Sequence, residues 1–125
     1  MTTGARQYRE LNVWARSVDW AEAIYRTTAN WPRDERFGLI SQIRRAAISV
    51  ASNIAEGAAR RTTGEFVQFV GVAQGSLAEA ETQLLLAQRL GYVADLDAGA
   101  LLRQSDEISR MLAGLATSLA KRRAS

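Results

Sequence analysis

A chain of 125 residues is long enough for one folded domain with a single core and too short for two ordinary domains. Apolar residues make up 47% and charged residues 23%, a balance typical of a globular protein, and the net charge is only +3. The chain has no cysteine and no histidine. This excludes disulfides, zinc–sulfur and iron–sulfur sites, and it removes the usual general base near neutral pH.

The first of four helices that the apolar spacing predicts spans about residues 12–30. Asn12 is its expected N-cap, and it ends before Pro32, because the residue preceding a proline disfavours the helical conformation. Its apolar stripe consists of Leu11, Trp14, Val18, Ala21 and Tyr25.

The second predicted helix spans about residues 34–59, and Asp34 and Glu35 suit the positive end of its dipole. Its apolar stripe consists of Ile40, Ile43, Ala47, Val50, Ile54 and Ala58, and a polar or small set on its flank consists of Gln42, Ser49, Asn53 and Glu56. Residues 60–64 are expected to form a tight link to the next helix.

The third predicted helix, about residues 64–90, has the most regular pattern, because its apolar residues alternate at steps of four and three. Gly91 is expected to end it in a left-handed conformation. Within it, Gly71 and Gly75 are expected to permit the close approach of another helix.

The fourth predicted helix, about residues 96–121, follows two N-cap candidates, Asp95 and Asp97, and finishes in basic residues. Four long helices with short links predict a single all-α domain over residues 1–125. The simplest arrangement is an antiparallel up-down-up-down four-helix bundle.

Apolar residues also occur away from these main stripes, for example Val72, Leu86 and Leu90 in the third helix and Leu39 and Ala46 in the second. A bundle helix needs only one apolar face. The surplus predicts either self-association or a monomer with wide internal contacts, and we favour self-association.

Three motifs carry a family resemblance: QIRRA at residues 42–46, SNIAEG at residues 52–57 and GSLAE at residues 75–79. Together, in this order and spacing, they resemble the 23S ribosomal RNA intervening-sequence proteins, the S23 group, over roughly residues 8–93. Phe37 stands where the family commonly has tyrosine, and Ala58 replaces a common glycine.

The resemblance implies a four-helix bundle that assembles into a pentameric ring with a central channel. Some members are encoded inside ribosomal RNA genes. A related protein, the accessory variability determinant of diversity-generating retroelements, works with a reverse transcriptase and binds nucleic acid. The resemblance therefore implies a fold and an assembly more strongly than a biological role.

Five polar residues near the motifs are candidates for a hydrogen-bonded network that fixes helix register: Gln42, Asn53, Glu56, Ser76 and Glu79. A buried carboxylate needs such partners, because burying it alone is costly. The alternatives are polar contacts at an interface between subunits, or catalysis or metal binding by the two glutamates. We favour the network, because known di-metal bundles use Glu-x-x-His pairs and this chain has no histidine.

Arg44, Arg45, Arg60 and Arg61 are the candidate nucleic-acid-binding residues, since guanidinium groups suit phosphate contacts. Residues 1–61 carry ten basic and six acidic side chains, whereas residues 62–125 carry six and seven. The alternative is an ordinary solvated surface, with one of Arg44 and Arg45 paired to Glu79 or Glu56.

The sequence thus predicts a non-enzymatic homo-oligomer, expected to be pentameric, that binds RNA or DNA with little sequence specificity. The alternative is an oligomeric adaptor for a protein partner, such as a reverse transcriptase, without direct nucleic-acid contact. No catalytic residue, cofactor or metal is expected. The first twenty residues have no apolar run of signal-peptide length, so the expected location is the cytoplasm, without membrane contact.

Overall fold

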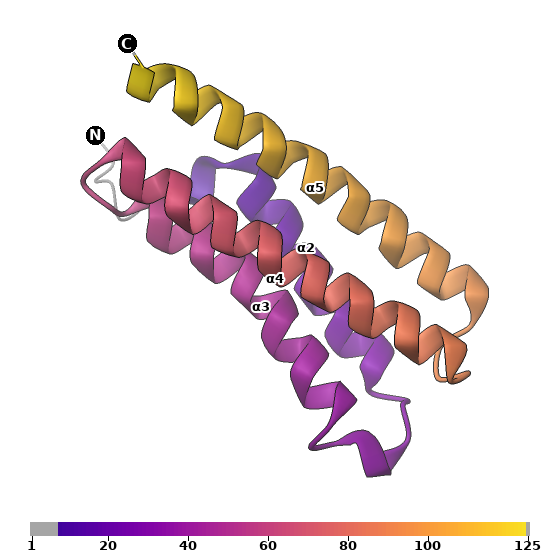
Figure 1. Cartoon of the computed structure of the whole chain (residues 1–125). Coiled ribbons are helices and arrows are strands. Elements are labelled where there is room, and N and C mark those ends of the chain that lie inside the picture. Colours follow the sequence, from indigo (N-terminus) through magenta and orange to yellow (C-terminus); the bar gives the residue numbers. More distant parts are fainter. Residues whose placement is uncertain (1–7, 125) are drawn as a thin grey trace.

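The computed structural model describes residues 8–124, and these residues form helices and short links without any strand (Figure 1). The elements in chain order are the short 3₁₀ helix η1 (Tyr8–Glu10), α2 (Asn12–Thr28), the 3₁₀ helix η2 (Arg33–Glu35), α3 (Leu39–Ala58), α4 (Thr63–Arg89) and α5 (Asp95–Ala124). The prediction of an all-helical chain with four long helices is confirmed. None of the helices in this part of the chain is long and apolar enough to cross a membrane.

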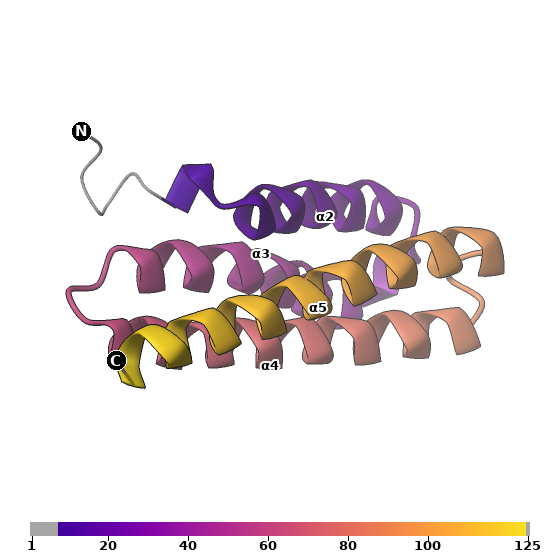
Figure 2. The same cartoon turned by 90° about the horizontal axis from the view of Figure 1, so that it is seen from above.

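The four long helices surround one apolar core. Each packs against the next in the chain, and α5 also packs against α2, while Figure 2 shows α5 crossing α4 obliquely. The largest fully buried side chains come from all four helices and include Trp20, Ile43, Leu84 and Leu112. Burying each such side chain contributes about 1.5–3 kcal/mol, so this core is the main source of stability.

The predicted N-cap of the first helix is wrong by one residue. The cap position belongs to Leu11, which makes no side-chain capping bond, and Asn12 is the first helical residue. The N–H of Leu11 donates to the carbonyl of Tyr8 at 3.0 Å, and its own carbonyl accepts from Trp14 at 3.1 Å. The 3₁₀ turn η1 therefore leads directly into α2.

The second predicted helix begins five residues later than expected, at Leu39 rather than residue 34. Residues 33–35 form η2 instead, and the carboxylate of Glu35 accepts the Leu39 N–H at 3.2 Å. Glu35 was expected inside the first turn of the helix. It instead precedes α3, and its carboxylate accepts a backbone N–H of the first turn that has no partner within the helix.

The end of α4 is as predicted. Gly91 has a φ of +79°, its N–H donates to the carbonyl of Gln88, and the N–H of Tyr92 donates to the carbonyl of Ala87. These two bonds are those of a Schellman motif, which requires the left-handed conformation that glycine adopts without strain.

The surplus apolar residues divide into two groups. Leu39 and Ala46 are buried within the chain, whereas Val72, Leu86 and Leu90 are about half exposed on α4. Contacts within one chain therefore account for the buried residues Leu39 and Ala46, and they do not account for the exposed ones.

Candidate nucleic-acid interface

Arg60 and Arg61 lie on the short link between α3 and α4. Thr62 fixes this link, because its hydroxyl accepts the Glu65 N–H at 3.1 Å and donates to the Glu65 carboxylate at 2.9 Å. This side-chain capping starts α4 directly after the arginines. Arg60 forms an exposed ion pair with Glu56 at 2.9 Å, while Arg61 is exposed and has no ion pair in the described residues.

The last turn of α5 returns to this link. Arg122 lines the same hollow of about 300 Å³ as Arg60 and Arg61, together with Leu11, Ala58, Thr62, Thr63 and Phe66. The Arg123 guanidinium carbon lies 3.3 Å from the position that a Cβ on Gly64 would occupy. Among the described residues no carboxylate lines the hollow. We call Arg60, Arg61, Arg122 and Arg123 the α3–α4 arginine cluster.

Arg44 is tethered to the C-terminal end of α2. Its Nε donates to the Thr28 hydroxyl at 2.8 Å, and its Nη2 donates to the Tyr25 carbonyl at 3.2 Å. Its guanidinium carbon also lies 4.5 Å from the centre of the Tyr25 ring. A cation is favourable at this negative helix end, so Arg44 joins α3 to α2 and does not pair with Glu56 or Glu79.

Arg45 is exposed beside Arg44 and lines a hollow of about 370 Å³ on the α2–α3 side of the bundle. A second hollow of about 300 Å³ shares Arg36, Ile40 and Arg44 with the first and adds Arg33. We call Arg33, Arg36, Arg44 and Arg45 the α2–α3 arginine cluster. The four predicted arginines therefore belong to two clusters, since Arg45 and Arg60 are separated by roughly 22 Å along α3.

The predicted polar network is smaller than expected. The Asn53 amide donates to the carbonyl and the hydroxyl of Ser49, both at 2.8 Å, and the Ser49 and Ser76 hydroxyls are 2.8 Å apart. Ser49, which the sequence places on the flank of the helix but not in the network, is thus the central member. It could have been found from its position four residues before Asn53.

The remaining candidates for the network lie elsewhere. Gln42 and Glu79 are exposed and make no hydrogen bond within residues 8–124, and the exposed Glu56 pairs with Arg60. Their placement on the surface contradicts a role in a buried network within one chain.

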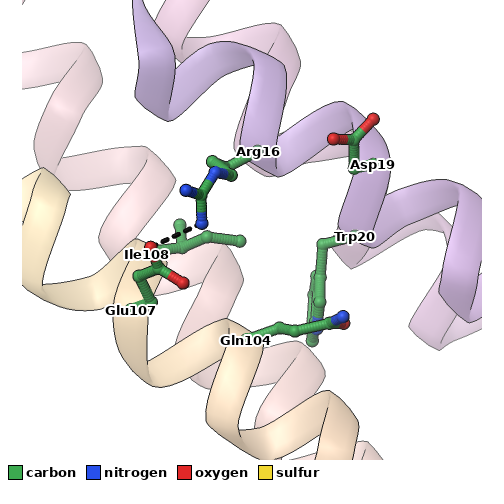
Figure 3. Close-up of a pocket in the computed structure, with 6 residues that line it drawn as sticks. All are labelled: Arg16, Asp19, Trp20, Gln104, Glu107 and Ile108. Atoms are coloured by element: carbon green, nitrogen blue, oxygen red, sulfur yellow. Dashed lines mark hydrogen bonds and ion pairs between the residues drawn. The ribbon is translucent and has the colours of Figure 1, made fainter.

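A further hollow of about 280 Å³ lies between α2 and α5 (Figure 3). Arg16 forms an ion pair with Glu107 across it, and the Asp19 carboxylate is directed away from this pair. Trp20 closes the hollow and donates its indole N–H to the Leu101 carbonyl at 3.0 Å. Two carboxylates against one arginine make this hollow unsuited to an anion, unlike the two arginine clusters.

Within the described residues, no three acidic side chains come close enough to hold a metal ion. The phenol of Tyr92 has a shifted pKa and donates to Glu35 at 2.9 Å. This hydrogen bond, removal from water and the nearby charges of Glu35 and Asp34 raise the pKa of Tyr92. A phenol held protonated in this way stabilises the fold.

Sequence reasoning missed four of the clustered arginines: Arg33, Arg36, Arg122 and Arg123. The last two were visible as a basic tail, but only tertiary structure brings the end of α5 to the α3–α4 link. Arg33 and Arg36 were not considered as binding residues, because they lie where the second helix was expected to start.

A model of the 23S rRNA-intervening sequence protein family matches residues 9–114. A crystal structure of a protein of unknown function from the S23 ribosomal protein family of Bacteroides thetaiotaomicron has a TM-score of 0.75 and is 24% identical in sequence. The match covers 83% of this chain and 97% of that one, and it shows a common fold. None of the curated proteins matches this chain.

Proposed function

Because this chain belongs to the 23S rRNA-intervening sequence protein family, we propose that it is a non-enzymatic homo-oligomeric bundle that binds RNA or DNA in the cytoplasm. The α3–α4 arginine cluster supports this proposal most directly, since arginines from the α3–α4 link and from the end of α5 converge on one hollow that no carboxylate of residues 8–124 lines. Guanidinium groups contact phosphate through paired, charge-assisted hydrogen bonds. Nothing in the cluster reads base edges, so binding has little sequence specificity.

The assembly we propose is a ring, expected to be a pentamer, of antiparallel up-down-up-down bundles. Contacts between late α3 and early α4, such as Gly57 with Phe66, support the antiparallel arrangement. The exposed apolar residues of α4 support contact between copies. A ring repeats the arginine cluster once per copy, which strengthens the positive field and gives multivalent binding to a long polyanion.

The test is the double variant Arg60→Glu/Arg61→Glu, measured by the fluorescence anisotropy of a labelled RNA at several salt concentrations. We expect affinity to fall by at least about tenfold at 0.1 M salt, and the wild-type association constant to fall steeply as salt rises. The matched control is Arg103→Glu/Arg110→Glu, which makes the same change in charge on exposed positions of α5. Circular dichroism checks that both variants stay helical.

If both double variants lost the same amount of RNA affinity, the loss would come from the change in net charge alone. The α3–α4 arginine cluster would then be removed from the proposal. Two results together would support the adaptor function instead. The wild type would not bind nucleic acid, and it would still recover a protein partner after nuclease treatment of the sample. A reverse transcriptase is the partner to look for in that case.

A further inference from the structure

The α2–α3 arginine cluster has an excess of positive charge that residues 8–124 do not neutralise. Its four arginines line two adjoining hollows, and no carboxylate from the described residues lines either one. None of these arginines forms an ion pair in that part of the chain.

The carboxylates near this cluster in the sequence, Asp34 and Glu35, do not pair with its arginines. One Glu35 oxygen accepts the Leu39 N–H at 3.2 Å and the other accepts the Tyr92 hydroxyl at 2.9 Å. Asp34 is exposed and lines neither hollow. The charge of the cluster is therefore available to a ligand.

One buried hydrogen-bond donor in this region also lacks an acceptor within residues 8–124. Trp31 lines the second hollow, is only 5% exposed, and has an indole N–H that is buried without a partner in the described chain. A region with an unpaired N–H and surplus positive charge suits an oxyanion such as phosphate.

Phe37 adds an aromatic surface to the cluster. Its side chain is 87% exposed, although burial of a phenylalanine is normally favourable. The ring centre lies 5.7 Å from the guanidinium carbon of Arg36, which lines both hollows. Arg36 therefore connects the Phe37 ring to both hollows.

We propose that the α2–α3 arginine cluster and Phe37 form a site for single-stranded nucleic acid, in which phosphates contact Arg36 and Arg45 and a base stacks on the Phe37 ring. Positively charged grooves with exposed aromatic rings bind single strands in this manner. A duplex keeps its bases stacked on one another and offers only phosphates, so it gains nothing from the ring. This inference rests on the proposed function and names the form of nucleic acid that the protein prefers.

The experiment compares a fluorescein-labelled strand of about 12 nucleotides with the duplex of the same sequence. We expect Phe37→Ala to weaken single-strand binding about 5- to 150-fold and to leave duplex binding unchanged. Phe37→Tyr keeps the ring and restores single-strand affinity. The matched control is Leu96→Ala, which removes another exposed apolar side chain (81%) on α5, outside the cluster.

A second pair of variants tests the phosphate contacts. Arg36→Gln and Arg45→Gln are each expected to make the salt dependence of single-strand binding shallower by about 0.7 in log–log slope. Unchanged slopes in both would overturn the placement of phosphates in this cluster.

The remaining outcomes separate the two proposals. If neither the strand nor the duplex binds the wild type, the proposed function fails, and this inference fails with it. If both bind and Phe37→Ala affects neither form, or both equally, only the single-strand site is overturned. A fall in oligomer mass in Phe37→Ala would make the ring a contact between copies and would also overturn the site.

Discussion

Tyr92 and Glu35 join two links that are far apart in the sequence. The phenol belongs to the segment between α4 and α5, and the carboxylate belongs to η2, where it also accepts the first N–H of α3. Trp31 lies beside Tyr92, with ring centres 6.0 Å apart. One carboxylate thus satisfies the start of a helix and fixes the neighbouring link at this end of the bundle.

The raised pKa of Tyr92 predicts how this contact depends on pH. The folded state raises the pKa of Tyr92, so it holds the phenol proton more tightly than the unfolded chain does. The stability that this contact contributes is therefore fully present below the ordinary phenol pKa of about 10, and it is lost as pH rises through the pKa of Tyr92 in the folded state. We expect the difference in urea midpoint between wild type and Tyr92→Phe to be larger at about pH 8 than at about pH 11. Tyr25→Phe is the control, and an equal difference at both pH values would contradict the prediction.

At the scale of elements, the contact between α3 and α4 depends on small residues. A Cβ on Gly57 would lie 2.7 Å from the Phe69 Cβ and 2.9 Å from the Phe66 ring. Farther along, the Ser49 and Ser76 hydroxyls meet at 2.8 Å. Close approach and a cross-helix hydrogen bond together fix the register of these two helices.

Gly57→Ala is therefore expected to lower the free energy of unfolding by about 1–3 kcal/mol, because the α4 backbone at Phe69 and the Phe66 ring must both shift. Gly114→Ala is the matched control in α5, where nothing lies within 4 Å of the new Cβ. It should raise the free energy of unfolding by about 0.5–1 kcal/mol through helix propensity. Urea denaturation measures both, and a Gly57→Ala variant as stable as Gly114→Ala would refute the close contact.

Predictability from sequence differed between elements for physical reasons. The end of α4 was predicted correctly because the Schellman motif, with Gly91 at its left-handed position, depends on a few neighbouring residues. The start of α3 was wrong because Glu35 interacts with Leu39 and Tyr92, and the second of these partners is distant in the chain. Local signals were sufficient where the interaction was local.

The candidate site follows the same rule. The sequence predicted arginine pairs, yet it did not reveal that Arg44 is held by the end of α2 or that Arg122 lies beside Arg60 and Arg61. Gln42 and Glu79 were expected in a hydrogen-bonded network because they lie in the sequence motifs, on flanks of their helices that could meet a neighbour, but the face that they occupy is exposed. Periodicity identifies faces of a helix and does not say which face meets a neighbour.

At the scale of the whole molecule, the outer face of α4 is an exposed apolar surface that packing within one chain does not explain. Val72, Leu86 and Leu90 are each about half exposed, and Gly71 and Gly75 are exposed with nothing within 4 Å of an added Cβ. The close helix approach predicted for the two glycines does not occur within the described chain. This face is the one we propose for contact between copies.

Val72→Glu/Leu86→Glu tests that contact, because two charges in an apolar interface lack compensation. We expect light scattering on a size-exclusion peak to give a mass near one chain, 13.7 kDa, for the variant. The wild type is expected near five copies of 13.7 kDa, about 69 kDa. Ser109→Glu on α5 is the control, and a wild-type mass near one chain would refute the assembly.

Leu11, just before α2, and Arg122, near the end of α5, line the same hollow at the α3–α4 link. A polypeptide fused before α2 or after α5 therefore emerges next to the arginines, where an acidic tag would compete with phosphate. A circular permutant that joins these ends and opens the chain between Gly91 and Ala94 would move both termini to the opposite end of the bundle. Such a permutant leaves the arginines free of any attached tag.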